Sequence, residues 1–180
     1  METLIDRIES LFAERGGAGY DRSPDLPLSP LSRALQCAQL AEWSGADPAL
    51  VAAALLHDVG SLADAAPGDP AQRTLQWLGG DLGADVLEPI RLHAAARRYL
   101  AATDAAWRAD GVVPMSAGEV RAYESEPYAV EAVQLRRWIE QACEPGKRTP
   151  TLDYYLHLLD EVLERPALDS KTGIGPISVV

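Results

Sequence analysis

Apolar residues recur every three to four positions along most of this chain. The first such repeat is carried by Leu4, Ile5, Ile8, Leu11 and Phe12. This spacing predicts a helix over residues 3–15, which Thr3 can cap and which Gly16 and Gly17 stop.

The same periodicity predicts further helices, separated by breaks rich in glycine and proline. They are expected over residues 31–44, 49–60, 71–78, 85–100, 128–143 and 151–163, with a helical turn or two over 103–108. Asp47 and Pro48 pair an N-cap with proline at the first helical position, and Ser116 with Glu119 forms a capping box that opens another helix. No stretch alternates in the manner of a strand, so the sequence predicts an all-α fold.

The most apolar of these segments is ALVAAALLHDVG, residues 49–60. Its valine and leucines supply bulk, while its alanines keep the helix thin enough for close neighbours. His57 and Asp58 follow this apolar run, where core residues would be expected. Burying such polar groups is costly unless they are hydrogen-bonded or hold a metal. We expect Gly60 to end the helix, as glycine does just past a C-terminus.

Composition and charge narrow the classes of protein and of ligand. A length of 180 residues suits one domain with a sizeable core, and a 47% apolar content rich in alanine suits a helical globule. The net charge of −11 argues against nucleic acid and against an anionic membrane surface as partners. The longest apolar run falls far short of the roughly 20 residues of a membrane span. A small anionic substrate can still bind where a few arginines converge.

Cysteine usage and the N-terminal residues bear on the compartment. Cys37 and Cys143 lack CxxC spacing, so they imply neither a disulfide framework nor a zinc site. The first residues carry acids early and no small-residue cleavage site, so no signal peptide is expected. These features predict a cytoplasmic protein, of an oligomeric state that the sequence leaves open.

Three blocks of sequence carry a more specific signal. They are LSRALQCAQLAEWSGADPALVAAALLHDVG, RLHAAARRYLAATD and PMSAGEVRAYESEPYAVEAVQLRRW. In order and spacing they resemble the HD-domain oxygenases that cleave aminohydroxy-phosphonates with a mixed-valent di-iron centre, over roughly residues 20–163. The resemblance implies a single HD-domain helical bundle over residues 1–165, followed by an extended tail over residues 166–180. In that family four histidines and two aspartates hold two irons.

Only half of this ligand set is kept. The resemblance assigns three ligands to His57, Asp58 and His93. The other three positions hold Arg33, Pro70 and Ile139. Arginine stays protonated and repels a cation, and proline and isoleucine have no donor atom to offer. Glu140 follows Ile139 but points about 100° around the helix, so it is a poor replacement. The sequence therefore predicts no di-iron cofactor, and a residual single ion only on His57, Asp58 and His93.

The resemblance also implies a substrate site. Arg97 replaces a substrate-binding lysine four residues after His93, and Arg136 matches an arginine that contacts the phosphonate. Tyr20 matches a tyrosine of the family, and Ser61 stands where the family has a substrate-handling histidine. Arg33 is expected to put its guanidinium where a metal charge was, paired with Asp58 or with a bound anion.

Three functions remain open from the sequence. The first is a metal-independent enzyme, such as a lyase, isomerase, cyclase or hydrolase, acting on a phosphate-, phosphonate- or carboxylate-bearing substrate. In it His57 or His93, supported by Asp58, would be the acid–base group. The second is a non-catalytic binding protein or pseudoenzyme partner that keeps the pocket only to hold a ligand; separately, His57, Asp58 and His93 could be a hydrogen-bonded relic in the core without function. The third is an oxygenase or phosphohydrolase with an altered metal site.

Overall fold

The computed structural model describes residues 2–17, 28–63 and 68–165. Within these ranges the chain contains α-helices and one 3-10 helix, and no strand. The prediction of an all-α bundle is therefore confirmed. Tyr20 and the expected tail, residues 166–180, lie outside the described residues.

The helices follow the predicted order closely. They are α1 (Leu4–Arg15), α2 (Pro30–Trp43), α3 (Pro48–Leu56), α4 (Val59–Ala63), α5 (Pro70–Leu78), α6 (Ala84–Thr103), the 3-10 helix η1 (Ala105–Trp107), α7 (Ala117–Glu124), α8 (Ala129–Gln141) and α9 (Leu152–Glu164).

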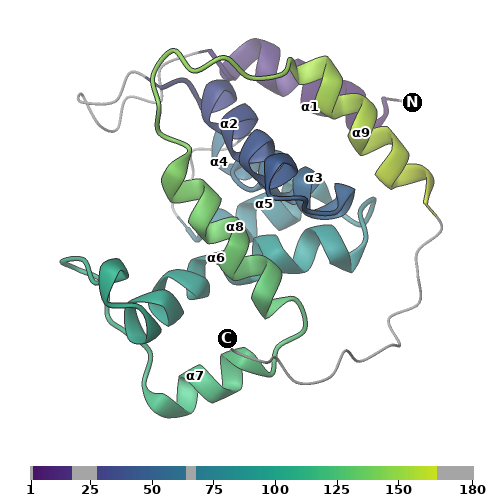
Figure 1. The fold of residues 1–180 in the computed structure, drawn as a ribbon. Coiled ribbons are helices and arrows are strands. Elements are labelled where there is room, and N and C mark those ends of the chain that lie inside the picture. The colour runs from purple at the N-terminus through teal and green to yellow at the C-terminus, as the bar shows by residue number, and fades with distance from the viewer. Residues whose placement is uncertain (1, 18–27, 64–67, 166–180) are drawn as a thin grey trace.

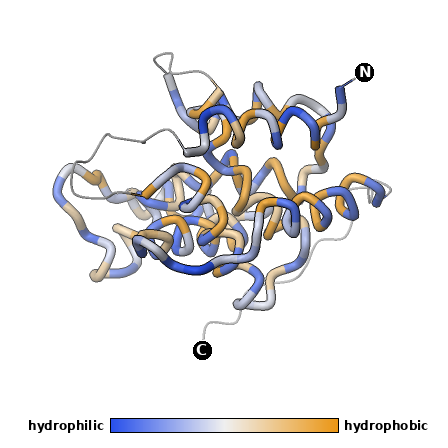
Figure 2. Tube along the Cα trace, turned by 90° about the horizontal axis from the view of Figure 1, so that it is seen from above, coloured by the Kyte–Doolittle hydropathy of each residue, from blue (hydrophilic) through white to orange (hydrophobic). Residues whose placement is uncertain are grey.

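Helix α3 lies at the centre of the bundle. Every residue from Ala49 to Leu56 is buried, because α2, α6, α8 and α9 pack around it. Figure 1 shows α1 and α9 side by side on one flank and α7 at the opposite edge, where it packs against α6 and α8. The tube in Figure 2 is mostly hydrophobic where the helices face one another and hydrophilic on its outer turns. Whatever follows α3 directly is thus held in the core.

Three predicted caps form as expected. The Thr3 hydroxyl accepts a hydrogen bond from the Asp6 backbone in a complete capping box, and Ser116 does the same with Glu119. The Asp47 carboxylate accepts from the Leu50 backbone, with Pro48 at the first position of α3. Each cap satisfies a backbone N–H that has no partner inside its helix. Local sequence chemistry therefore sets these helix starts.

The end of the central helix differs from the prediction. Helix α3 ends at Leu56, two residues form a turn, and Gly60 lies inside the short helix α4 rather than at a helix end. Gly60 is needed for a different reason. A Cβ added there would lie 2.2 Å from the backbone nitrogen of Thr74. Gly60 thus lets α4 and α5 approach closely, and periodicity along one helix cannot reveal such a contact.

Contacts from Gln36 and from its apolar neighbours attach α2 to α8 and to the residues that follow α8. The fully buried Gln36 amide donates to the Glu144 carbonyl at 2.8 Å and accepts from the Glu144 backbone N–H at 3.1 Å. Cys37 and Ala38, next to it on α2, belong to the same apolar core as Leu135 and Trp138 of α8. This attachment brings residue 33 of α2 beside residue 139 of α8.

No helix in the described part of the chain has the length and apolar character to cross a membrane.

Candidate functional site

Two buried histidines lie together at the end of α3. His57 is the residue that caps α3, and His93 lies in the middle of α6. Their ring centroids are 6.1 Å apart, with the ring planes at 79°, and their exposed fractions are 6% and 9%. Residues that are 36 positions apart in the sequence are thus joined in one polar cluster inside the core.

The backbone sets the tautomer of both rings. Nδ1 of His57 lies 2.9 Å from the Ala54 carbonyl oxygen, and Nδ1 of His93 lies 2.6 Å from the Ile90 carbonyl oxygen. A carbonyl oxygen can only accept, so each Nδ1 carries the proton and each neutral ring keeps its lone pair on Nε2. Both histidines are therefore oriented to accept a proton or to bind a cation through Nε2.

Burial keeps both rings uncharged near neutral pH. Loss of hydration lowers the pKa of His57 to about 4, the Asp58 carboxylate opposes this, and the charges of His93 and Arg33 add to the lowering. Burial is also the main cause that lowers the pKa of His93, and the charge of Arg136 acts in the same direction. The structure thus brings His57, Asp58 and His93 within the electrostatic reach of two arginines.

Arg33 contacts Ile139, and the family resemblance matches both positions to metal ligands. It is half-buried on α2, and its Nη2 donates to the carbonyl oxygen of Ile139 on α8 at 3.4 Å. Its positive charge also lowers the pKa of His57 and opposes the burial that raises the pKa of Cys37, one turn further along α2. A fixed positive charge therefore stands close to the histidines. Its pairing with Asp58 remains a prediction.

Arg136 reaches the same cluster from α8 but is itself ion-paired. Its guanidinium binds the Glu140 carboxylate one turn further along the helix. Its side chain is 14% exposed, and within the described part of the chain its buried Nε has no hydrogen-bond partner. The charge of Arg136 acts on both His93 and Cys37. An anion that reaches Arg136 therefore meets a guanidinium with one donor unused and another already taken.

Thr74 fixes the turn that carries His57 and Asp58. Its hydroxyl on α5 donates to the His57 carbonyl and accepts from the Gly60 N–H, each at 3.2 Å, and the residue has no exposed surface. One side chain thereby satisfies the end of α3 and the start of α4. Sequence analysis missed Thr74, because a lone threonine in an amphipathic helix carries no signal of a contact 17 residues away.

The residues around the predicted accessory positions also form contacts. The Ser61 hydroxyl accepts from Nη2 of Arg73 at 3.4 Å, and Nη1 of Arg73 donates to the Gly68 carbonyl. Pro70 begins α5 and is exposed, while the Asp69 carboxylate before it caps the helix and tends to raise the pKa of His93. The sequence signal for Asp69 was the Asp-Pro pair, which predicts a cap and not a site.

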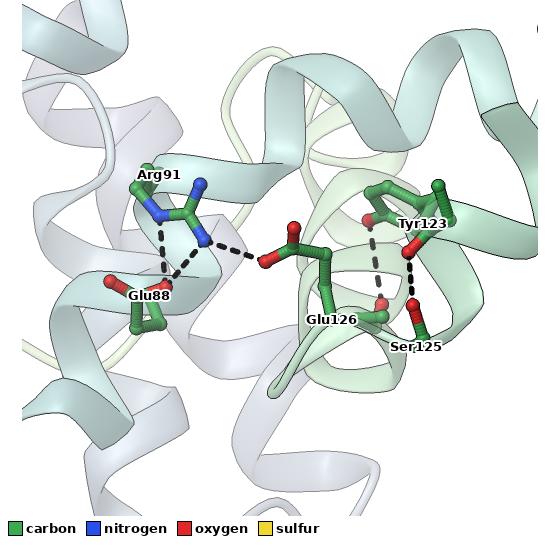
Figure 3. A network of polar contacts seen from close by, with 7 residues as sticks. Glu88, Arg91, Tyr123, Ser125 and Glu126 are labelled. Carbon is green, nitrogen blue, oxygen red and sulfur yellow. Dashed lines mark hydrogen bonds and ion pairs between the residues drawn. The ribbon is translucent and has the colours of Figure 1, made fainter.

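The arginines of α6 divide into two kinds. Arg91 bridges Glu88 and Glu126 at the surface, as Figure 3 shows, and Arg98 pairs with Glu119. Arg97 is exposed one turn beyond His93, without a polar partner among the described residues. Of these three side chains, Arg97 is the one left available to a ligand.

The loss of the dinuclear iron centre remains a prediction from the sequence. No three His, Cys, Asp or Glu side chains come together as metal ligands within residues 2–17, 28–63 and 68–165. Of the replaced positions, Arg33 contributes a cation and binds the backbone of Ile139, whose side chain is buried among apolar residues. Pro70 occupies the first position of α5 and contributes no donor atom. His57, Asp58 and His93 are described residues, and they too do not form a group of three metal ligands in this structure.

A surface pocket elsewhere has a structural role. It measures about 250 Å³ and lies between α1 and the ends of α4 and α5. Arg7 on its wall donates to the Trp77 carbonyl and stacks on the Trp77 ring, and Arg15 donates to the Leu62 and Ala63 carbonyls. These arginines satisfy the last carbonyls of two helices, as cations do at C-termini. The pocket is therefore not part of the histidine site.

An all-helical bundle whose buried central helix ends in a His-Asp pair, with a further histidine beside it, defines an HD-domain protein. The chain is 32% identical to a hydroxymethylphosphonate dioxygenase of Gimesia maris, over 91% of this chain and 91% of that protein. It is 25% identical to a (1-hydroxy-2-(trimethylamino)ethyl)phosphonate dioxygenase, glycine-betaine-forming, of Leisingera caerulea, over 90% and 91% of the two chains. No family profile matches the sequence. The chain belongs to the family of HD-domain phosphonate dioxygenases.

Proposed function

We propose that this protein is a metal-independent enzyme that transfers protons on a small phosphonate-bearing substrate. The observation that carries the proposal is the pair of buried imidazoles, 6.1 Å apart, each with Nδ1 bound to a backbone carbonyl. Each neutral imidazole has a free lone pair on Nε2 that can accept a proton, and it becomes an effective general base when a bound anion brings its lowered pKa back toward neutral pH. A positive side chain in place of a metal ligand supports chemistry without iron.

The roles of the charged residues follow from their positions. Arg97 and Arg136 bind the phosphonate, since guanidinium groups match its oxygens in charge and geometry. Arg33 supplies the permanent positive charge that the metals supply in the family. The negative charge of a bound phosphonate raises the proton affinity of His57 and His93. The Asp58 carboxylate then stabilises the imidazolium that forms after proton transfer.

The names of the two relatives support a phosphonate as the substrate. Both proteins are phosphonate dioxygenases, and both cover about nine-tenths of this chain. By the family resemblance we assign Ser61 and Tyr20 to the same substrate site, and the Ser61 hydroxyl accepts a hydrogen bond from Arg73. Because the family resemblance predicts that three ligand positions are lost, we propose a reaction that consumes no oxygen, of the lyase, isomerase, cyclase or hydrolase class.

Binding is tested first, by calorimetric titration of hydroxymethylphosphonate. We expect Arg97→Ala to weaken binding about tenfold or more, which corresponds to the loss of one charge-assisted hydrogen bond. Arg108→Ala is the matched control, since Arg108 is exposed near η1 and outside the site. Unchanged affinity in Arg97→Ala would remove Arg97 from the proposed site.

Catalysis is tested next, by following a panel of phosphonates by phosphorus NMR under argon and with a chelator. His57→Gln and His93→Gln are expected to abolish any conversion. Binding without conversion would favour the alternative of a non-catalytic binding protein. Conversion that requires iron and oxygen would refute the proposal.

The metal content has its own test. We expect elemental analysis to find no iron pair in the protein. The triple variant Arg33→His, Pro70→His, Ile139→Asp is expected to gain iron, because it restores the set of four histidines and two aspartates. The single variant Ile139→Asp is the control, since one added carboxylate does not complete the set. Two irons per chain in the unaltered protein would contradict the proposed loss of the centre.

A further inference from the structure

We propose that Glu140 is an internal competitor for the anion site, and that its carboxylate must leave Arg136 when a phosphonate binds. This inference rests on the proposed function, because it assumes that Arg136 is part of the substrate site. It adds a residue that the family resemblance assigns to no role.

The contact geometry is that of a held but releasable pair. Arg136 and Glu140 are one turn apart on α8, and their side chains form an ion pair. The arginine side chain is 14% exposed and the glutamate side chain is 41% exposed. The guanidinium is therefore anchored in the protein, whereas the carboxylate can rotate into solvent once another anion takes its place at the guanidinium.

A second observation points to a missing ligand at the arginine. Nε of Arg136 has no exposed surface and no hydrogen-bond partner within the described residues. Buried donors are nearly always satisfied, and one that is not calls for an acceptor. Glu140 satisfies Nη2 but leaves Nε unpaired. A phosphonate has three oxygens and more negative charge than one carboxylate, so it can serve both donors where Glu140 serves one.

The change in phosphonate affinity when Glu140 loses its charge distinguishes two roles of this residue. If Glu140 blocks Arg136, removing its charge frees the guanidinium and tightens phosphonate binding. If Glu140 instead orients Arg136 for the ligand, the same change weakens binding. Ion pairs near the surface contribute up to about 1 kcal/mol, which corresponds to a factor of about five in affinity, so we expect Glu140→Gln to bind hydroxymethylphosphonate roughly two- to fivefold more tightly.

The matched control is Glu126→Gln. Glu126 is also a glutamate paired with an arginine and has a similar exposed fraction of 44%. The change alters the net charge of the protein by the same amount, so it reports any general electrostatic effect. A double variant, Arg136→Ala with Glu140→Gln, shows whether the gain acts through Arg136, since Glu140→Gln should have no effect once Arg136 is absent.

The experiment is calorimetric titration of hydroxymethylphosphonate into the full chain and these variants. Tighter binding by Glu140→Gln alone, lost in the Arg136→Ala background, supports the inference. Equal or weaker binding by Glu140→Gln, while the unaltered protein binds, overturns the inference and leaves the proposed function standing. If neither the unaltered protein nor Glu140→Gln binds hydroxymethylphosphonate, the inference and the proposed function are both overturned.

Discussion

The burial of His57 makes a quantitative prediction about the effect of pH on stability. The pKa of His57 is lowered from 6.5 to about 4, chiefly because the ring is buried away from water. The unfolded chain therefore takes up a proton between these values that the folded protein does not. The unfolded state binds more protons, so the free energy of unfolding falls as pH falls below about 6.5 and stops falling below about 4.

The magnitude follows from the two pKa values. Over the full range the shift corresponds to about 3 kcal/mol, and about 2 kcal/mol of that is lost between pH 7.5 and pH 5. The lowered pKa of His93 acts in the same direction. Urea unfolding at the two pH values measures the loss directly.

His57→Gln isolates the contribution of this ring. The variant removes the titrating group, so its stability is expected to depend on pH by about 2 kcal/mol less than that of the unaltered protein over this interval. His157→Gln is the control, because His157 is exposed on α9. If His57→Gln and the unaltered protein lose stability in parallel, burial of His57 does not cause the pH dependence, and the placement of the ring in the core is wrong.

Three further predictions concern Thr74, Gly60 and Arg33, and all are tested by urea denaturation. Thr74→Val keeps the shape of the side chain but leaves the buried His57 carbonyl and Gly60 N–H without a partner, so it should lower the free energy of unfolding by roughly 2–4 kcal/mol. Thr74→Ser keeps the hydroxyl and should lower it by about 1 kcal/mol. Equal losses in the two variants would mean that the hydroxyl contributes nothing. Gly60→Ala should lower the free energy of unfolding by about 1–3 kcal/mol, because the added Cβ separates α4 from α5. Gly118→Ala is the control: it lies in α7 with open space around it and should raise the free energy of unfolding by up to about 1 kcal/mol. An unchanged stability in Gly60→Ala would contradict the close approach of the two helices. Arg33→Ala should lower stability by roughly 1–3 kcal/mol, because the Ile139 carbonyl loses its donor, and an unchanged stability would argue against that contact.

Local patterns in the sequence were sufficient for most of the helices and for three of their starts, but not for the short helix α4. The caps at Thr3, Asp47 and Ser116 depend on residues three positions apart, so the sequence states them directly. The apolar run after Pro48 likewise implied burial of whatever followed it. The family resemblance added His93 to the His-Asp pair, which no local pattern could have done.

Tertiary structure decided what surrounds that pair. Gly60 and Thr74 form one contact between α4 and α5. From the sequence, Gly60 was predicted to be a helix end, and Thr74 had no signal that set it apart from other helix positions. The spacing of four residues is compatible with an Arg136–Glu140 ion pair, but it does not show that the charge of Arg136 acts on His93. Periodicity encodes which side of a helix is apolar. The partner that each polar side chain finds depends on how the helices pack, and that packing involves residues far apart in the chain.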